Sequence, residues 1–244
     1  LRGWRRRHRL VRGDLAPVVI LGIVQFAVFA YLYTAALQYT TAGRAALSIA
    51  IIPLLTMVIA GLRHQETITV TKIAGVLVAG AGVAVVLGDA LIPEVGMAGV
   101  WRGDVLMLGA ALCASLYNVL ARPYFWRNGS TTVLLWSMGA GMLALAPFAF
   151  ASDVAAQFGA FGALEWGLAG FVGVVGGAFA ITLWVYALSR ASPTRVAVFA
   201  ALNPPVAVGL GVVFLGEPLS LRIILGLVCV IAGIVLANHE GLSR

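Results

Sequence analysis

Eight apolar runs without a charged side chain divide this sequence of 244 residues. Their boundaries are 15–43, 45–62, 73–88, 105–121, 128–152, 166–189, 196–216 and 223–238. A helix needs about 17–25 mainly apolar residues to cross a bilayer, and the shorter runs reach that length with a flanking polar residue. The runs lack the alternation of apolar and polar positions that marks the strands of a membrane β-barrel. They therefore predict an all-α polytopic membrane protein with about eight transmembrane helices, embedded in the lipid bilayer.

Composition excludes a soluble domain. Hydrophobic residues make up 61% of the chain and charged residues 10%, whereas an average soluble domain is about a quarter charged. Cys113 and Cys229 lie in separate apolar runs without a second type of metal ligand nearby, so neither a disulfide framework nor a metal site is expected. Six of the sixteen Lys and Arg residues lie between positions 2 and 12, beside the first run. That placement favours a membrane surface over nucleic acid as the partner of the net charge of +7.

One stretch of the sequence occurs twice. Residues 34–86 return as residues 185–237 at a constant offset of 151 positions, without a gap. The matched pairs that carry weight are Leu37 with Leu188, Arg44 with Arg195, Pro53 with Pro204, Glu66 with Glu217, Ile73 with Ile224, Gly75 with Gly226, and Gly82 with Gly233. Alanine, leucine and valine match by chance in apolar sequence. Arginine, proline, glutamate and glycine kept in register indicate a true internal repeat.

The basic residues predict the orientation in the membrane. If the N-terminal arm is cytoplasmic, thirteen of the sixteen Lys and Arg residues fall on the cytoplasmic side and three on the outer side. The cytoplasmic ones are Arg2, Arg5, Arg6, Arg7, Arg9, Arg12, Arg63, Lys72, Arg122, Arg127, Arg190, Arg195 and Arg244. The outer ones are Arg44, Arg102 and Arg222. This positive-inside bias predicts that the N-terminus and the C-terminus both lie in the cytoplasm.

The two copies of the repeat start in different helices. The first copy begins in the first predicted helix and the second in the sixth, five crossings later, so the copies run in opposite directions through the bilayer. Inverted repeats are the architecture of secondary transporters, whose substrate site lies near the bilayer midplane where the repeats meet. Neither a channel nor a membrane enzyme requires this arrangement.

A glycine-containing pattern closes the second copy. Gly216-Glu217-Pro218, followed by Gly226 and Gly233, resembles the end of an EamA domain, the repeat unit of the drug/metabolite transporter superfamily. The first copy keeps the same spacing but has Gln65 in place of the first glycine. The run from Gly103 to Arg122 resembles the opening helix of such a domain.

The resemblance implies a fold of ten helices in two five-helix repeats. Residues 15–89 would then be the last three helices of the first repeat, and residues 103–238 the complete second repeat. We therefore expect two further helices before Leu1. The upstream reading frame should encode about 50–60 mostly apolar residues, at roughly 20 for each spanning helix.

The sequence offers no catalytic constellation. It contains no HExxH motif, glycine-rich phosphate loop or GxSxG elbow, and no pair of carboxylates within one apolar run. His8, His64 and His239 all lie in predicted cytoplasmic segments, where isolated histidines are ordinary interfacial residues. We therefore expect the protein not to be an enzyme and to need no cofactor.

Glu66 and Glu217 are equivalent acids, each standing just before a predicted helix. One interpretation makes them proton-coupling groups. The other, which we favour, makes them caps, because a carboxylate stabilises the free N–H groups and the positive end of a helix. Pro53 and Pro204 are assigned a structural role, since proline removes a backbone donor and bends a helix.

Neutral polar and aromatic residues within the apolar runs are the candidates for a substrate site. Those that the family resemblance places on cavity-lining helices are Gln25, Tyr31, Ser48, Tyr117, Asn118, Trp184 and Asn203, with Ser115, Thr182 and Tyr186 on the same helices. The sharpest is Asn203, because the two prolines that follow it break the helix beside an amide. The alternative for each residue is a structural role, since such groups also hold helices together in lipid.

A set of glycines has the spacing of a helix contact. Gly75, Gly80, Gly82, Gly226 and Gly233 fall near the small-xxx-small pattern that lets helices approach closely. We expect these residues to pack helices against each other. The family resemblance makes the same helices peripheral, so a homodimer contact is an open alternative.

These patterns together predict a carrier of the bacterial inner (plasma) membrane that works by alternating access. The family resemblance implies a small-molecule substrate, such as an amino acid or an amphipathic compound, and favours export. The run cores hold no charge, which favours a neutral or zwitterionic substrate, because charge there is costly. The alternatives are a non-transporting membrane scaffold and an inactive truncated remnant.

Overall fold

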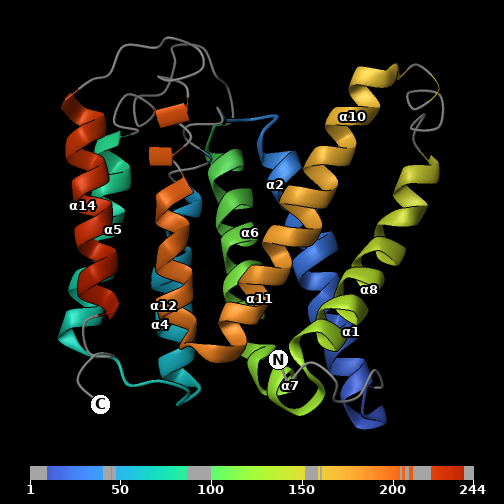
Figure 1. Ribbon diagram of the computed structural model, residues 1–244, viewed down its shortest axis with the longest axis horizontal. Helices are drawn as coiled ribbons and strands as arrows, with labels where there is room; N and C mark the ends of the chain where they lie inside the picture. Colours follow the sequence, from blue (N-terminus) through green and yellow to red (C-terminus); the bar gives the residue numbers. More distant parts are fainter. Residues whose placement is uncertain are drawn as a thin grey trace. The chain divides into compact units, whose positions relative to one another are not determined.

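The computed structural model describes residues 10–40, 45, 48–86, 100–151, 159, 161–203, 205–206, 209–210 and 221–238. Helices account for most of these residues, and no strand occurs among them (Figure 1). In chain order the elements are η1 Arg12–Asp14, α1 Leu15–Ile23, η2 Val24–Val28, α2 Phe29–Ala36, α4 Ile52–Leu62, α5 Val70–Val86, α6 Val100–Leu120, α7 Arg122–Asn128, α8 Ser130–Ala151, α10 Ala163–Phe171, η4 Val172–Phe179, α11 Ala180–Arg190, α12 Pro193–Ala197, η5 Val198–Leu202 and α14 Leu221–Asn238. Of these, η1 and η5 are 3-10 helices, whereas η2 and η4 are π-helices.

The apolar helices coincide with the eight predicted runs. In the part of the chain that the structure describes, four are long and apolar enough to cross a membrane: Arg12–Ala36, Trp101–Leu120, Ser130–Phe148 and Ala163–Arg190. Within the described residues, four shorter apolar helices fall on the other runs: Ile52–Leu62, Val70–Val85, Pro193–Leu202 and Ile224–Asn238. A run of about 17 residues or more can cross the bilayer as one helix, in which the backbone N–H and C=O groups bond to each other, as a bilayer requires. The predicted all-α polytopic membrane fold is therefore confirmed.

The chain forms two compact units. The first consists of Leu1–Val28 and Leu120–Arg190, and the second of Phe29–Val119 and Ala191–Arg244. In the first unit α1 packs along α8, where Gly22 lies against the backbone of Ser137. The absence of a side chain at this glycine is what lets the two helices approach, as small residues do in membrane proteins.

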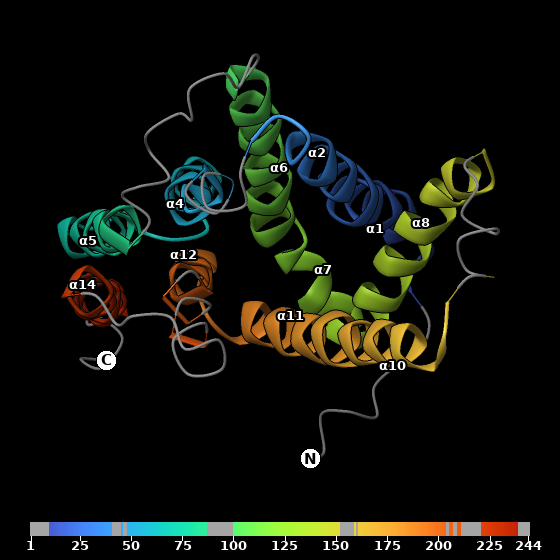
Figure 2. The same cartoon turned by 90° about the horizontal axis from the view of Figure 1, so that it is seen from above.

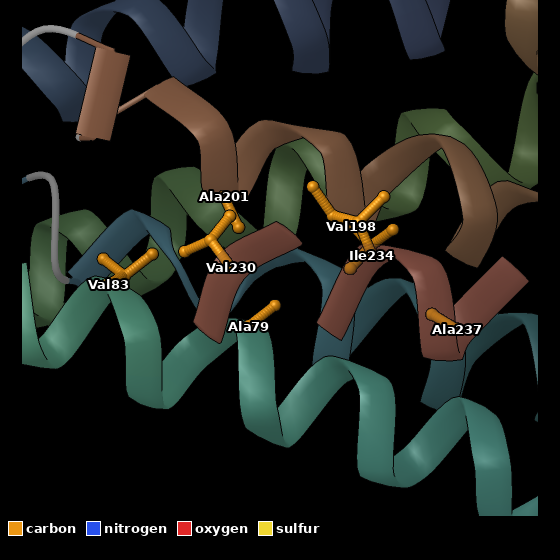
Figure 3. Packing of buried hydrophobic residues seen from close by; sticks show 7 residues of the cluster. All are labelled: Ala79, Val83, Val198, Ala201, Val230, Ile234 and Ala237. Atoms are coloured by element: carbon orange, nitrogen blue, oxygen red, sulfur yellow. The ribbon is translucent and has the colours of Figure 1, made fainter. Parts of the chain in front are cut away.

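Within the described residues of the second unit, buried apolar side chains form clusters at three places. One cluster joins α5, α14 and η5, and its members are Ala79, Val83, Val198, Ala201, Val230, Ile234 and Ala237 (Figure 3). Another cluster joins α4, α6 and α12 through Ile52, Ala111, Ala114 and Ala197. The third consists of Ala36, Ala45 and Met107. Alanine supplies three of the seven buried members of the first cluster, three of the four of the second and two of the three of the third. Close helix contact in lipid depends on such small side chains.

Helices α5 and α14 lie side by side and run in opposite directions (Figures 1 and 2). A Cβ atom built on Gly233 would lie 2.6 Å from the carbonyl oxygen of Gly75. A Cβ atom built on Gly82 would lie 2.7 Å from the carbonyl oxygen of Gly226. No side chain fits at either place, so glycine is required by the close approach of the two backbones.

The same contact displays the internal repeat. The offset of 151 positions relates Gly75 to Gly226 and Gly82 to Gly233. In the structure each glycine touches the copy of the other one, at nearly equal distances. A two-fold axis between inverted copies produces this exchange, so the inverted repeat is confirmed for this pair of helices. Gly75, Gly82, Gly226 and Gly233 therefore pack α5 against α14 within one chain.

Two π-helices occupy equivalent places in the repeat. The offset carries η2, Val24–Val28, onto positions 175–179, which lie within η4, Val172–Phe179. A π-helix widens one turn of a helix and often marks a functional site. Nothing in the sequence analysis predicted these segments. Both segments lie before the two matched stretches, 34–86 and 185–237, in the helices where those stretches begin.

Polar contacts between distant segments agree with the predicted alternation of the helices. The indole N–H of Trp126 donates to the Ser189 carbonyl oxygen, and Asn128 donates to Asp14. In both cases the predicted topology puts the two segments on one side of the membrane. The contacts support the order of crossings, whereas the assignment of that side to the cytoplasm stays a prediction.

Candidate functional site

The two units divide the seven predicted substrate residues between them. Gln25 and Trp184 belong to the first unit. The second unit contains the other five, which are Tyr31, Ser48, Tyr117, Asn118 and Asn203. Their assignment to a substrate site stays a prediction, and each set is described within its own unit.

Gln25 is the polar residue of the π-helix η2. Its side-chain oxygen Oε1 is buried and accepts no hydrogen bond from the described residues. A buried acceptor without a donor costs about 1–3 kcal/mol. An N–H or O–H group of a ligand or of a water molecule would remove that cost, so Gln25 is suited to binding a neutral hydrogen-bond donor.

The five predicted residues of the second unit differ sharply in exposure. Tyr117 and Asn118 on α6 are only 2% and 3% exposed. Tyr31 on α2 is 60% exposed and Asn203 is also exposed, while Ser48 is half-buried. Tyr31 and Asn203 are therefore the members of this set whose side chains the described part of the unit does not cover.

The helix before Asn203 changes its geometry. The α-helix α12 ends at Ala197 and continues as the 3-10 helix η5, which ends at Leu202. Pro205 lacks the backbone N–H that would bond to the carbonyl group of Ala201 in a continuous α-helix. The tighter 3-10 turn is consistent with this missing donor. Pro204 lies outside the described residues.

Ser115 holds two helices together. Its hydroxyl oxygen lies 2.8 Å from the carbonyl oxygen of Ala111 in its own helix and 3.2 Å from that of Ile52 in α4. Both contacts are buried. Pro53 stands in the first turn of α4, where the missing N–H of proline costs no helical hydrogen bond.

Glu66 is the centre of a buried polar network. Its Oε2 atom lies 3.3 Å from the ammonium nitrogen of Lys72, and the side chains of this ion pair are only 4% and 6% exposed, respectively. Its Oε1 atom accepts hydrogen bonds from the backbone N–H of Thr194, at 3.3 Å, and from the Thr194 hydroxyl. Lys72 also donates to the Thr67 carbonyl oxygen at 2.8 Å. The network joins the two copies of the repeat.

The position of Glu66 differs from the simplest form of a cap. Thr194 is the second residue of α12, so the carboxylate lies at the N-terminus of α12 and not at that of α5, the helix that follows it in sequence. Sequence reasoning missed Lys72 and Thr194, which are six and 128 positions away from Glu66. Neither spacing is a recognised helical pair. Glu217 lies outside the described residues.

Comparison with known proteins decides the family. A model of the EamA-like transporter family matches residues 2–88 and 101–239. The chain belongs to this family. The resemblance found at the end of each repeat copy is thereby confirmed, together with membership of the drug/metabolite transporter superfamily.

Relatives of this EamA-like transporter come from archaea and bacteria. An uncharacterized transporter of Archaeoglobus fulgidus is 26% identical over 93% of this chain and 79% of its own length. A probable terminal-alkyne amino-acid exporter of Streptantibioticus cattleyicolor is 28% identical over 95% and 75%, respectively. The uncharacterized transporter YyaM of Bacillus subtilis is 26% identical over 93% and 74%. The chain is thus a multi-pass membrane protein of a transporter family.

A crystal structure of a further protein shares the fold. Its TM-score to this chain is 0.76, at 22% sequence identity, and the match covers 92% of this chain and 76% of the other. At that identity the likeness concerns the arrangement of the helices alone.

Proposed function

We propose that this EamA-like transporter exports small neutral or zwitterionic metabolites, such as amino acids or amphipathic compounds, by alternating access across the bacterial plasma membrane. The observation that carries the proposal is the distribution of charge. In the described spanning helices every charged residue lies near a helix end, whereas the middle turns carry only neutral groups. A solute with a net charge would find no counter-ion there.

The packing of the repeat supports an alternating mechanism. The glycines of α5 and α14 meet about a two-fold axis, and η2 and η4 occupy matched positions in the two copies. Inverted copies of this kind can exchange their conformations, which opens a shared site to one side of the membrane and then to the other.

The substrate class rests on neutral groups. The first unit offers the amide oxygen of Gln25 as an acceptor, and the second unit offers the exposed hydroxyl, aromatic and amide groups of Tyr31 and Asn203. Such groups suit a ligand with an apolar body and a few polar atoms. The name of the Streptantibioticus relative, an amino-acid exporter, favours amino acids and the outward direction.

A resistance screen tests the proposal in cells. Overexpression of the intact gene should protect bacteria against toxic analogues of neutral amino acids, by lowering their concentration inside the cell. Overexpression should not protect the bacteria against toxic analogues of charged amino acids. Equal sensitivity of the overexpressing and the empty-vector strains across a broad panel of neutral compounds would favour a scaffold or an inactive remnant.

Replacing Asn203 with Ala should weaken substrate binding or slow transport by roughly two- to tenfold, because one neutral hydrogen bond is worth about 0.5–1.5 kcal/mol. Membrane insertion should be unchanged. Asn238→Ala is the matched control, since the Asn238 amide bonds to the Ile234 carbonyl oxygen at the end of α14. Glu217→Gln should affect folding or expression more than affinity. Normal transport by Asn203→Ala, combined with lost proton dependence in a well-folded Glu217→Gln variant, would contradict this site.

The predicted orientation is tested by labelling single cysteines. In a background with Cys113 and Cys229 replaced by serine, a cysteine at Glu94 should react with a membrane-impermeant maleimide added to intact cells. A cysteine at Arg63, in the loop predicted to be cytoplasmic, should react only after permeabilisation. The reverse pattern would invert the topology and place both termini outside.

A further inference from the structure

Helix α1 of the first unit packs on α8 through one face. Val18 and Leu21 on this face are only 0% and 9% exposed. A Cβ atom built on Gly22 would collide with the backbone of Ser137, and one built on Gly141 would collide with the side chain of Phe26. The two helices therefore touch backbone to backbone at Gly22, which is the kind of contact that small residues allow in lipid.

The second copy of the repeat contains a counterpart of this helix. The helices Arg12–Ala36 and Ala163–Arg190 each run without a break into the matched stretches, which begin at residues 34 and 185. Within these helices the offset of 151 positions pairs identical residues, namely Gly22 with Gly173, Val24 with Val175 and Ala27 with Ala178. The face of α1 that packs on α8 thus corresponds to a face of α10 and η4 around Gly173.

This second face is uncovered by the described part of the first unit. Ala169, the counterpart of Val18, is exposed, and Val172, the counterpart of Leu21, is 65% exposed. No atom of the described residues outside its own helix lies within 4 Å of a Cβ atom built on Gly173. A glycine that another helix touches in the first copy is therefore kept in register in the second copy, where the described residues supply no such helix.

The family match indicates which segment would supply it. The match covers residues 2–88 in the first copy and 101–239 in the second, and the two ends, 88 and 239, are equivalent at the offset of 151 positions. The counterparts of residues 101–152 would therefore precede residue 2. Helix α8, Ser130–Ala151, lies in that stretch. Its counterpart is the second of the two helices that we expect before Leu1.

We propose that this upstream helix packs on the face of α10 and η4 around Gly173, in the way that α8 packs on α1 around Gly22. The two-fold exchange between α5 and α14 shows that inverted copies repeat their contacts. Helix α8 of the second copy lies on α1 of the first copy. The same axis therefore places the first-copy counterpart of α8 on α10 and η4. The proposal does not depend on the transported solute.

The first test compares unfolding temperatures of the purified, full-length protein in one detergent. Gly173→Ala should lower the unfolding temperature by several degrees, as Gly22→Ala should, because the added methyl group would meet the backbone of the upstream helix. If only lipid or detergent covers this face, Gly173→Ala should leave the temperature unchanged or raise it, since alanine favours a helix more than glycine does. That result would overturn the proposal.

Gly167→Ala is the matched control for this test. Gly167 also lies on α10, and nothing lies within 4 Å of a Cβ atom built there. Its counterpart in the first copy, Ala16, is exposed even though α8 is in place. Gly167→Ala should therefore not lower the unfolding temperature. An equal loss in Gly167→Ala and Gly173→Ala would show a general effect on the helix and would contradict a contact at Gly173.

The second test identifies the partner of Gly173 by a disulfide. In full-length protein with Cys113 and Cys229 replaced by serine, Gly173→Cys should link on oxidation to a cysteine at the upstream position equivalent to Ser137. The two Cα atoms should be close enough for the bond, because Gly22 and Ser137 touch through their backbones. Mass spectrometry of the digested protein should show the bond within one chain.

Phe171→Cys is the control for the disulfide, because its first-copy counterpart, Ile20, is 61% exposed beside α8. It should not link to the same upstream cysteine. A disulfide between two chains would make this face a homodimer contact and would overturn the proposal. The absence of any disulfide from Gly173→Cys to the upstream position, or equal linking by Phe171→Cys, would overturn it as well.

Discussion

Replacing Gly233 with Val should destabilise the protein by about 3 kcal/mol or more, because the new side chain would meet backbone atoms that cannot rotate away. A Cβ atom at this position already lies 2.6 Å from the carbonyl oxygen of Gly75 and 2.8 Å from the Cα atom of Ala79. Overpacking against movable side chains costs about 1–3 kcal/mol. Here the helices themselves must separate. Thermal or denaturant-induced unfolding in a fixed detergent measures the loss.

Gly80→Val is the matched control for this prediction. Gly80 lies on α5 as well, but nothing is within 4 Å of a Cβ atom built there. Its substitution should change the free energy of unfolding by less than about 0.5 kcal/mol, as surface changes do. Equal stability of the Gly233→Val and Gly80→Val variants would contradict the close contact of α5 with α14.

Replacing Lys72 with Met should destabilise the protein by about 3–5 kcal/mol, because it leaves the Glu66 carboxylate buried without its cation. The two side chains are 6% and 4% exposed, so water cannot take the place of the missing partner. Glu66→Gln should cost less, since the neutral amide can still accept the bond from Thr194. The unfolding free energy of each variant is the measurement.

The double variant Glu66→Gln/Lys72→Met distinguishes a buried ion pair from two independent contacts. It should be clearly more stable than the sum of the single effects predicts, because removal of both partners leaves no unpaired charge. Arg63→Gln is the control, as Arg63 is an exposed cation in the same connection between α4 and α5. Additive losses in the double variant would show that the ion pair does not couple the two residues.

The spanning helices of this fold were predictable from the sequence because the bilayer restricts what an apolar run can form. Spanning helices must satisfy their own backbone hydrogen bonds, so a charge-free apolar run has few alternatives to a helix. The repeat added the pairing of α5 with α14, because glycines kept in register mark the face where two backbones approach. The inverted order of the copies followed from counting crossings.

The polar partners were not predictable in the same way. Glu66 contacts Thr194, which lies 128 positions away, and no local spacing indicates that pair. The two copies of the repeat also differ at this place. Ile223 takes the position equivalent to Lys72, so Glu217 has no lysine at the position from which Lys72 pairs with Glu66. The π-helices η2 and η4 have no residue signature, and only the three-dimensional helix geometry reveals them.

The candidate substrate residues show the same limit. A helix that is apolar all round does not indicate which side faces a neighbouring helix, a solute or lipid. For this reason Asn118 and Asn203 were both assigned to the substrate site from the sequence, although only Asn203 has the two prolines beside it. The structure buries Asn118, at 3% exposed, and leaves Asn203 exposed. Gln25 gained support from an unpaired buried oxygen, which no sequence pattern could have disclosed.

Transport by the purified, full-length protein in proteoliposomes tests the proposed function most directly. Vesicles loaded with an unlabelled neutral amino acid should exchange it for labelled external substrate faster than protein-free vesicles do, and the rate should saturate with concentration. Neutral and zwitterionic competitors should inhibit this exchange, whereas lysine and glutamate should not. Exchange no faster than in protein-free vesicles for every neutral compound tried, or exchange restricted to charged solutes, would contradict the proposal.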